Sequence, residues 1–131
     1  MKKLLFFAFA VFLLFQCKTP QSTTTQTDSK VIIAKDSIEY DVIVTDIGYE
    51  RYLNTIAKPM SFYSQEYYEQ KNRLYVPIWN NRVRTSISST QRNIFEQEID
   101  YDRSVNYGLE VNYKLYNYFK FIEYTYNIKL F

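Results

Sequence analysis

Histidine is absent from the sequence, and Cys17 is the only cysteine among its 131 residues. These absences exclude Ser-His and Cys-His nucleophile pairs, zinc held by imidazole, and an internal disulfide bond. Glycine occurs only at Gly48 and Gly108, so a glycine-rich loop that cradles phosphate groups cannot be built. An enzyme of this composition would have to use carboxylates, Lys, Arg, Tyr or a hard metal ion, and no cofactor is expected.

The chain also lacks a net charge once the N-terminal segment is excluded from the count. The chain has 16 Lys and Arg against 14 Asp and Glu, but Lys2 and Lys3 belong to a segment that we expect to be removed. The remaining charges balance, so there is no electrostatic reason to expect nucleic acid as a partner. Tyrosine is in excess instead. All 14 tyrosines lie between Tyr40 and Tyr126, and each combines an apolar ring with a polar tip.

The N-terminal segment has the pattern of a lipoprotein export signal. Two lysines precede twelve apolar residues, Leu4 to Phe15, which are too few to span a bilayer because that takes about 20. Leu14 lies three positions before Cys17, as in signals whose cysteine is lipidated, although Gln16 replaces the usual small residue. We therefore predict a signal peptide over residues 1–16 and lipidation of Cys17. Cleavage by ordinary signal peptidase is the alternative, but no small-x-small site lies nearby.

The residues after Cys17 indicate where the anchor is held and where the folded domain begins. Lys18-Thr19-Pro20 contains no acid, which predicts an outer-membrane anchor that faces the periplasm. Lipoprotein maturation adds several acyl chains, enough for a stable anchor. The Ser/Thr/Gln-rich composition predicts a disordered linker over residues 17–37, followed by one globular domain over residues 38–131.

Apolar spacing within the domain predicts an α+β fold of order β-α-α-β-α, with a small sheet and a long amphipathic C-terminal helix. The expected elements are a strand at 38–46, a short helix at 49–56, a longer helix from Ser61 or Ser64, a strand at 94–101 and a helix at 107–128. Pro77 lies inside the longer helix and predicts a bend or a division into two helices. A basic stretch, 71–92, is expected to lie between the two acidic strands.

The last helix is predicted to bury one stripe of side chains on the core. At 100° per residue the stripe contains Val111, Leu115, Tyr118, Phe119, Ile122 and Tyr126.

Several segments of the domain match a known group of sequences. They are Phe62-Tyr63-Ser64-Gln65-Glu66-Tyr67-Tyr68-Glu69, Trp79-Asn80-Asn81-Arg82, Asp100-Tyr101, and Tyr107-Gly108-Leu109-Glu110-Val111-Asn112-Tyr113-Lys114-Leu115-Tyr116. From about Tyr40 onward the chain resembles an uncharacterised family of bacterial envelope lipoproteins of the Bacteroidota type, a domain of unknown function. The resemblance implies a discrete globular unit and transfers no activity.

Acidic residues near position 100 form the first candidate site. Asp100, Asp102 and Ser104 have the spacing that opens an EF-hand loop, but Val105 and Val111 stand where that loop needs Gly and Glu. A turn before the last helix is therefore the favoured interpretation, and no metal is expected. A wider set could bind a cation or supply an acid and a base, with a solvated strand face as the simpler interpretation. Its members are Glu96, Glu98, Asp100 and Asp102.

Aromatic residues form two further candidates. Tyr113, Phe121 and Tyr124 point away from the apolar stripe of the last helix, so they predict a contact surface for protein or glycan. The alternative is that the helix is covered on both sides. Trp79 with Arg82 could clamp a ligand, although a lone Trp in register with Tyr75 is more typical of a core.

These observations favour a lipid-anchored envelope protein whose domain is a binding or structural module. Its partners would be the membrane, through the lipid, and an envelope protein or glycan. The alternative is a small hydrolase without histidine that acts on envelope polysaccharide through the carboxylates near position 100.

Overall fold

The computed structural model describes residues 31–35 and 40–130, which form two strands, four α-helices and one turn of 3-10 helix. Strand β1 (Val31–Lys35) pairs antiparallel with β2 (Tyr40–Val44), with Val31 opposite Val44. The helices follow as α2 (Tyr49–Thr55), η2 (Met60–Phe62), α3 (Gln65–Thr85), α4 (Ser89–Ile94) and α5 (Gly108–Tyr126). The α+β class, the small sheet and the long C-terminal helix are therefore confirmed.

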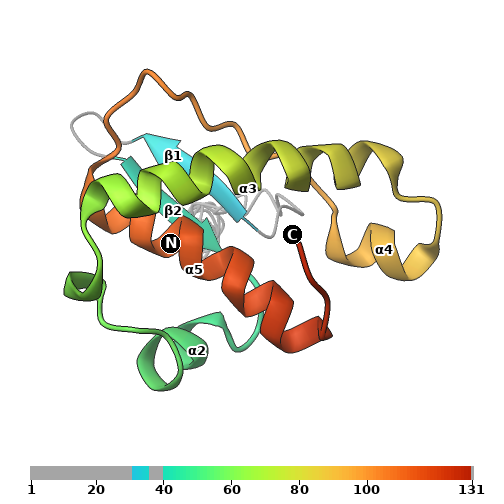
Figure 1. Cartoon of the computed structure of the whole chain (residues 1–131). Helices are drawn as coiled ribbons and strands as arrows, with labels where there is room; N and C mark the ends of the chain where they lie inside the picture. The colour runs from blue at the N-terminus through green and yellow to red at the C-terminus, as the bar shows by residue number, and fades with distance from the viewer. Residues whose placement is uncertain (1–30, 36–39, 131) are drawn as a thin grey trace, which may run out of the picture.

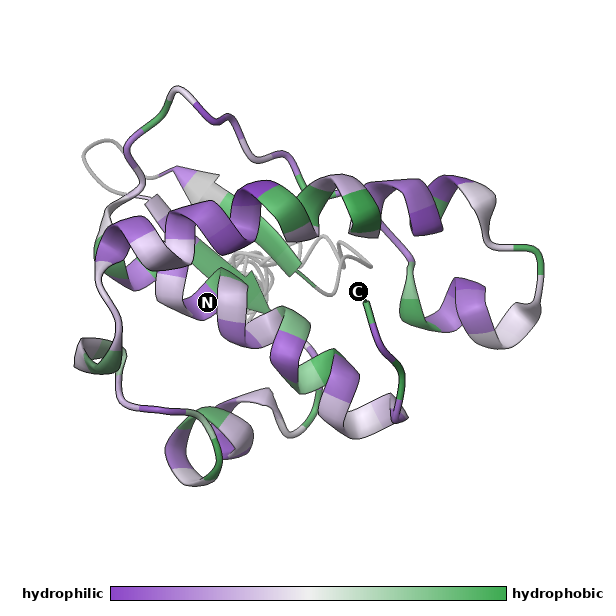
Figure 2. Ribbon diagram, viewed as in Figure 1, coloured by the Kyte–Doolittle hydropathy of each residue, from purple (hydrophilic) through white to green (hydrophobic). Residues whose placement is uncertain are grey.

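Helix α5 lies at the centre of the fold, against α3, β2 and α2 (Figure 1). Its predicted stripe is buried except at the end of the helix: Leu115, Tyr118, Phe119 and Ile122 are all 0 % exposed, whereas Tyr126 is 38 % exposed. In Figure 2 the middle of α3 and strand β2 are coloured as hydrophobic, which matches their contact with α5. The periodicity of the sequence was sufficient to predict this packing because a helix repeats every 3.6 residues.

The predicted linker extends too far along the chain. Residues 31–35, which we assigned to it, form β1, and Val31 is 2 % exposed. The apolar run that begins at Val31 buries one side chain in the core and pairs with β2, so it gains both burial and a hydrogen-bonded neighbour. The Ser/Thr/Gln-rich part of the predicted linker, the signal peptide and Cys17 lie outside the described residues.

Helix α3 begins where predicted and continues through Pro77 as one helix, so of the two outcomes predicted at Pro77, a bend or a division, the division does not occur. Ser64 caps it by accepting a hydrogen bond from the Tyr67 backbone N–H at 3.3 Å. Proline lacks an N–H, which leaves the carbonyl oxygen of Arg73 without its usual helical partner. Arg103 supplies the missing donor, because its Nη2 lies 3.1 Å from that oxygen.

The predicted strand at 94–101 is also wrong, and the order of elements is accordingly β-β-α-α-α-α. Ile94 ends α4, and the chain then runs without regular structure to α5. The alternation of the sequence there predicts that Phe95, Gln97, Ile99 and Tyr101 face one way. Phe95 and Ile99 are buried and Gln97 is exposed, and the segment pairs with side chains of α3 and not with a strand. The Asn80 side chain donates to Ile99 O at 2.9 Å and accepts from Ile99 N at 2.8 Å, as a neighbouring strand would.

Candidate functional site

The connection between α2 and α3 is held against α5 by two tyrosines. The Tyr113 hydroxyl, from α5, donates to the carbonyl oxygen of Lys58 at 2.9 Å. The Tyr68 hydroxyl, from α3, donates to the carbonyl oxygen of Met60 at 3.3 Å. Pro59 lies between these two points in an extended conformation and precedes η2. The connection is thereby fixed as a wall that faces the middle of α5.

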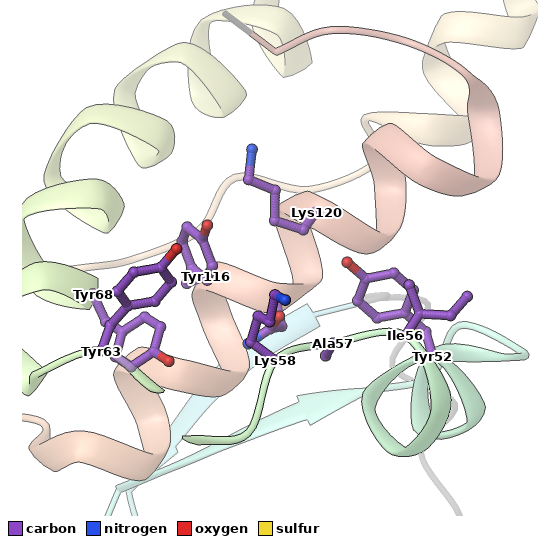
Figure 3. A pocket seen from close by; sticks show the side chains of 9 residues that line it. Tyr52, Ile56, Ala57, Lys58, Tyr63, Tyr68, Tyr116 and Lys120 are labelled. Atoms are coloured by element: carbon purple, nitrogen blue, oxygen red, sulfur yellow. The ribbon is translucent and has the colours of Figure 1, made fainter. Parts of the chain in front are cut away.

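A hollow of about 240 Å³ lies between this wall and the helix, and we call it the α5 cleft. Figure 3 shows Tyr63, Tyr68 and Tyr116 on one side of the cleft, Tyr52 and Ile56 on the other, and two lysines between them. The cleft is lined by Tyr52, Ile56, Ala57, Lys58, Tyr63, Tyr68, Tyr116, Asn117 and Lys120. Aromatic rings thus form the walls, and a few polar groups converge on the space between them.

Two lysines line the cleft, and only one of them is paired with a carboxylate among the described residues. Lys120 Nζ lies 2.8 Å from Glu123 Oε2 and 5.1 Å from the centre of the Tyr75 ring. Burial alone would lower the pKa of Lys120, but its hydrogen bonds to Glu123 and Tyr75 raise it, so the ammonium stays charged. Lys58 Nζ lies 5.1 Å from the Phe62 ring and makes no ion pair within the described residues.

Neutral polar groups complete the lining. Burial raises the pKa of Tyr52, Tyr68 and Tyr116, so their hydroxyl groups stay protonated at neutral pH. Asn117 is 4 % exposed, and its Nδ2 donates to the Tyr113 carbonyl oxygen at 2.9 Å. In the described part of the chain nothing donates to Asn117 Oδ1, which leaves an acceptor at the cleft.

The chemistry of this lining suits binding. No Asp, Glu or Cys is among the described residues that line the cleft, so no carboxylate or thiolate is placed to act as base or nucleophile. Hydroxyl and ammonium donors, one amide acceptor and aromatic faces are the groups that fix a polar ligand in a pocket.

A family model described as a family of unknown function, DUF6146, matches residues 4–131. The chain belongs to this family. The resemblance read from the sequence is thus confirmed as far as a domain of unknown function. Searches of curated proteins and of solved structures found no match.

The structure separates the three aromatic residues that were predicted to form a contact surface in this DUF6146 chain. Phe121 is buried, with its ring centre 5.6 Å from that of Tyr49 and 5.7 Å from that of Tyr52. Tyr113 is half-buried and holds the wall of the cleft, whereas Tyr124 is 64 % exposed. The surface is not one patch, because α2 covers the reverse side of α5 at Phe121.

The acidic candidates do not converge either. Glu96, Glu98, Asp100 and Asp102 are all exposed, and no group of three or more acidic, His or Cys side chains within the described ranges could hold a metal ion. Glu98 pairs with Arg84 at 2.7 Å. Asp102 accepts from the backbone N–H and the hydroxyl of Ser104, which lowers the pKa of Asp102 and forms the predicted turn.

The Trp79 candidate is part of the core. Trp79 is 1 % exposed, and its Nε1 donates to the carbonyl oxygen of Gln97 at 2.8 Å. Arg82 Nη2 lies 2.6 Å from the carbonyl oxygen of Lys129, so it holds the C-terminal segment. Both side chains therefore join distant parts of the fold and are not available as a ligand clamp.

Sequence reasoning missed the α5 cleft itself. Its lining comes from α2, the connection after α2, α3 and α5, and no spacing within one segment relates these residues. The one signal that pointed towards it was the excess of tyrosine, four of which line the cleft. None of the helices in the described residues is long and apolar enough to cross a membrane.

Proposed function

We propose that the protein is a lipid-anchored component of a bacterial cell envelope and that its domain is a non-enzymatic binding module. The α5 cleft is its binding site, and an envelope glycan or protein is its partner. The observation that carries this proposal is the lining of the cleft, where tyrosine rings surround Asn117, Lys58, which is unpaired among the described residues, and Lys120, whose ammonium is paired with Glu123 outside the lining. Rings with polar tips are typical of contact sites that stay partly wet.

The lipid anchor is supported by the N-terminal pattern. The match to the family begins at residue 4, so the apolar run and Cys17 both lie within the matched region. We place the anchor in the outer membrane, facing the periplasm, as in envelope lipoproteins of the Bacteroidota type. Replacement of Cys17 by Ala should abolish acyl labelling and block the shift to the mature size. Full acyl labelling of this variant would contradict the lipidation of Cys17. Protease added to intact cells should leave the protein undigested, and rapid digestion would contradict its placement on the periplasmic side.

The hydrolase alternative gains no support from the geometry. Three hollows in the described part of the chain, including the α5 cleft, are lined without Asp or Glu. Hydrolysis by two carboxylates requires them to face one another across the substrate, at about 5–10 Å. Exposed acids on an irregular segment, one of them paired with Arg84, do not make such a site.

A pair of lysine variants tests the cleft as the binding site. Lys58 lines the cleft and is exposed, whereas Lys129 is an exposed lysine that does not line it. The tethered wild-type protein and the Lys58→Ala and Lys129→Ala variants would be captured from envelopes, and the bound proteins and monosaccharides measured. We expect Lys58→Ala to lose most of the partner and Lys129→Ala to retain it. Equal retention by both variants would rule out the cleft as the site.

A further inference from the structure

A second hollow, of about 350 Å³, lies beside the α5 cleft and shares Tyr52 and Ile56 with it. It is lined by Ile47, Gly48, Arg51, Tyr52, Thr55, Ile56, Phe121, Tyr124 and Thr125. Three apolar or aromatic side chains on it are open to solvent, and we call them the α2 patch. They are Ile47, Tyr124 and Ile56, which are 100 %, 64 % and 45 % exposed. Large apolar side chains gathered in this way on a surface mark an interaction site.

Ile47 lies in a turn that is fixed by hydrogen bonds before and after it. Gly48 has φ +97°, a left-handed conformation that residues with a side chain rarely adopt, and it begins α2. Before the turn, Asp46 accepts from the Tyr118 hydroxyl at 3.3 Å. After it, Tyr52 N donates to Gly48 O at 2.8 Å. The complete exposure of Ile47 is therefore a feature of the folded turn.

The N-terminal segment enters the domain beside this patch. Val31, the first described residue, is paired with Val44, and Ile47 follows only three residues later. From the spacing of paired strands and of consecutive Cα atoms, the Cα atoms of Val31 and Ile47 are at most about 17 Å apart. Cys17 precedes Val31 by 14 residues, a span that cannot exceed about 50 Å.

We propose that the α2 patch contacts the surface of the bilayer that holds the lipid on Cys17, an inference that rests on the lipid anchor of the proposed function. A domain tied at Val31 presents this end to the bilayer with the shortest span of chain, because Val31 and Ile47 lie at most about 17 Å apart. Tethering also makes the contact intramolecular, so a few apolar side chains are sufficient.

The chemistry of the patch matches a membrane–water interface. Tyrosine is enriched there because its ring enters the boundary while its hydroxyl stays in water. Among the described residues that line the hollow, Arg51 is the charged one, and an arginine beside the patch attracts anionic lipid headgroups. An isoleucine such as Ile47, exposed in free solution, would be buried among acyl chains at the surface.

Labelled cysteine variants test the contact in the full lipidated protein. The lipid occupies the sulfur of Cys17, so an introduced cysteine is the one free thiol of the mature chain. Ile47→Cys is matched by Ile87→Cys, which replaces an 86 % exposed isoleucine between α3 and α4, away from α2 (Figure 1). Each variant would carry an environment-sensitive fluorophore in vesicles of phosphatidylethanolamine and phosphatidylglycerol, with nitroxide lipids as quenchers.

We expect at least a twofold loss of fluorescence for the Ile47→Cys label and almost none for the Ile87→Cys label. Equal quenching at both positions, or none at Ile47→Cys while the protein floats with the vesicles, would overturn the proposal. A blue shift at Ile47→Cys that is insensitive to quencher and disappears on dilution would also overturn it, because a second copy would then cover the patch. Failure of the anchor is recognised separately, because wild-type protein would then carry the fluorophore on Cys17 and would not float.

Discussion

Arg103 donates a hydrogen bond from Nη2 to the backbone carbonyl oxygen of Arg73, 3.1 Å away, at the point where Pro77 interrupts the hydrogen bonds of α3. The relationship is reciprocal, since Arg73 Nη2 lies 3.4 Å from the carbonyl oxygen of Arg103. A side chain from the irregular segment before α5 thus substitutes for the N–H that proline lacks. This explains how a helix of 21 residues contains a proline at its thirteenth position.

The compensation by Arg103 can be measured by a double-mutant cycle. Pro77→Ala should stabilise the domain by about 1–3 kcal/mol, because the helix regains an N–H donor to Arg73 O. Arg103→Ala should cost about 0.5–1.5 kcal/mol in the wild-type background, the usual contribution of one hydrogen bond. In the Pro77→Ala background the same change should cost almost nothing. Urea unfolding of the four proteins gives the coupling energy, and a value near zero would contradict the compensation.

The buried pair Asn72 and Asn112 predicts unequal effects for two similar substitutions. Asn72 Nδ2 donates to the Asn112 carbonyl oxygen at 3.0 Å and to Asn112 Oδ1 at 3.1 Å, while Asn72 Oδ1 is buried without a partner. Asn72→Leu removes that unpaired acceptor and should change the free energy of unfolding by less than about 1 kcal/mol. Asn112→Leu removes the side-chain Oδ1 that accepts from both Asn72 and the Tyr101 hydroxyl, so the hydroxyl loses this acceptor and Asn72 keeps only the backbone carbonyl; the change should cost about 2–4 kcal/mol. Similar unfolding midpoints for the two variants would contradict this.

We expect side chains on both sides of α5, as far as Phe121, to contribute to the stability of the domain. Leu115→Ala should cost about 2–5 kcal/mol and Phe121→Ala about 3–5 kcal/mol, because both side chains are buried and each change leaves a cavity. Tyr124→Ala should cost less than about 1 kcal/mol, since its ring is 64 % exposed. Thermal melts of the three variants compare these positions directly. A mild effect of Phe121→Ala would restore the surface predicted from the sequence.

Alkaline pH should unfold the domain through its buried tyrosines. Burial raises the pKa of Tyr49 and Tyr118 well above the value of about 10 that both have in an unfolded chain. Above pH 10 the folded state therefore holds more protons, and its stability falls as pH rises, by about 1.4 kcal/mol per pH unit for each residue. Below pH 10 this contribution is constant. Urea unfolding from pH 8 to 12 should show the decline, with a shallower slope in Tyr118→Phe, and a flat profile would contradict it.

The parts of the fold that the sequence predicted are those decided within one element. The stripe on α5 repeats every three or four residues, so its burial could be read from spacing. The alternation of residues 94–101 likewise identified Phe95 and Ile99 as inward-facing. It did not identify what satisfies the backbone there, because an asparagine side chain on α3 and a strand can make equivalent hydrogen bonds. The predicted strand was therefore wrong, although two of its inward-facing residues were identified.

The candidate site was likewise predicted only in the properties that do not depend on tertiary packing. A count of residues was enough to exclude imidazole and thiolate chemistry and to reveal the excess of tyrosine, because composition does not depend on the fold. Whether a given tyrosine or phenylalanine is exposed depends on what packs over it. Phe121 and Tyr124 are three residues apart on one helix and both contact Tyr52 of α2, yet the first is buried and the second is 64 % exposed.

By itself, then, the sequence determined which side chains are present and which face of α5 is apolar. Only the tertiary structure decided that Lys58, Tyr68 and Lys120 line one cleft, and that Arg103 completes α3. The reason is physical: periodicity and composition are properties of contiguous chain, whereas a cleft or a substituted hydrogen bond joins residues from different elements, such as Arg73 and Arg103, which are 30 positions apart. Their meeting depends on how whole elements pack, and no local pattern encodes that packing.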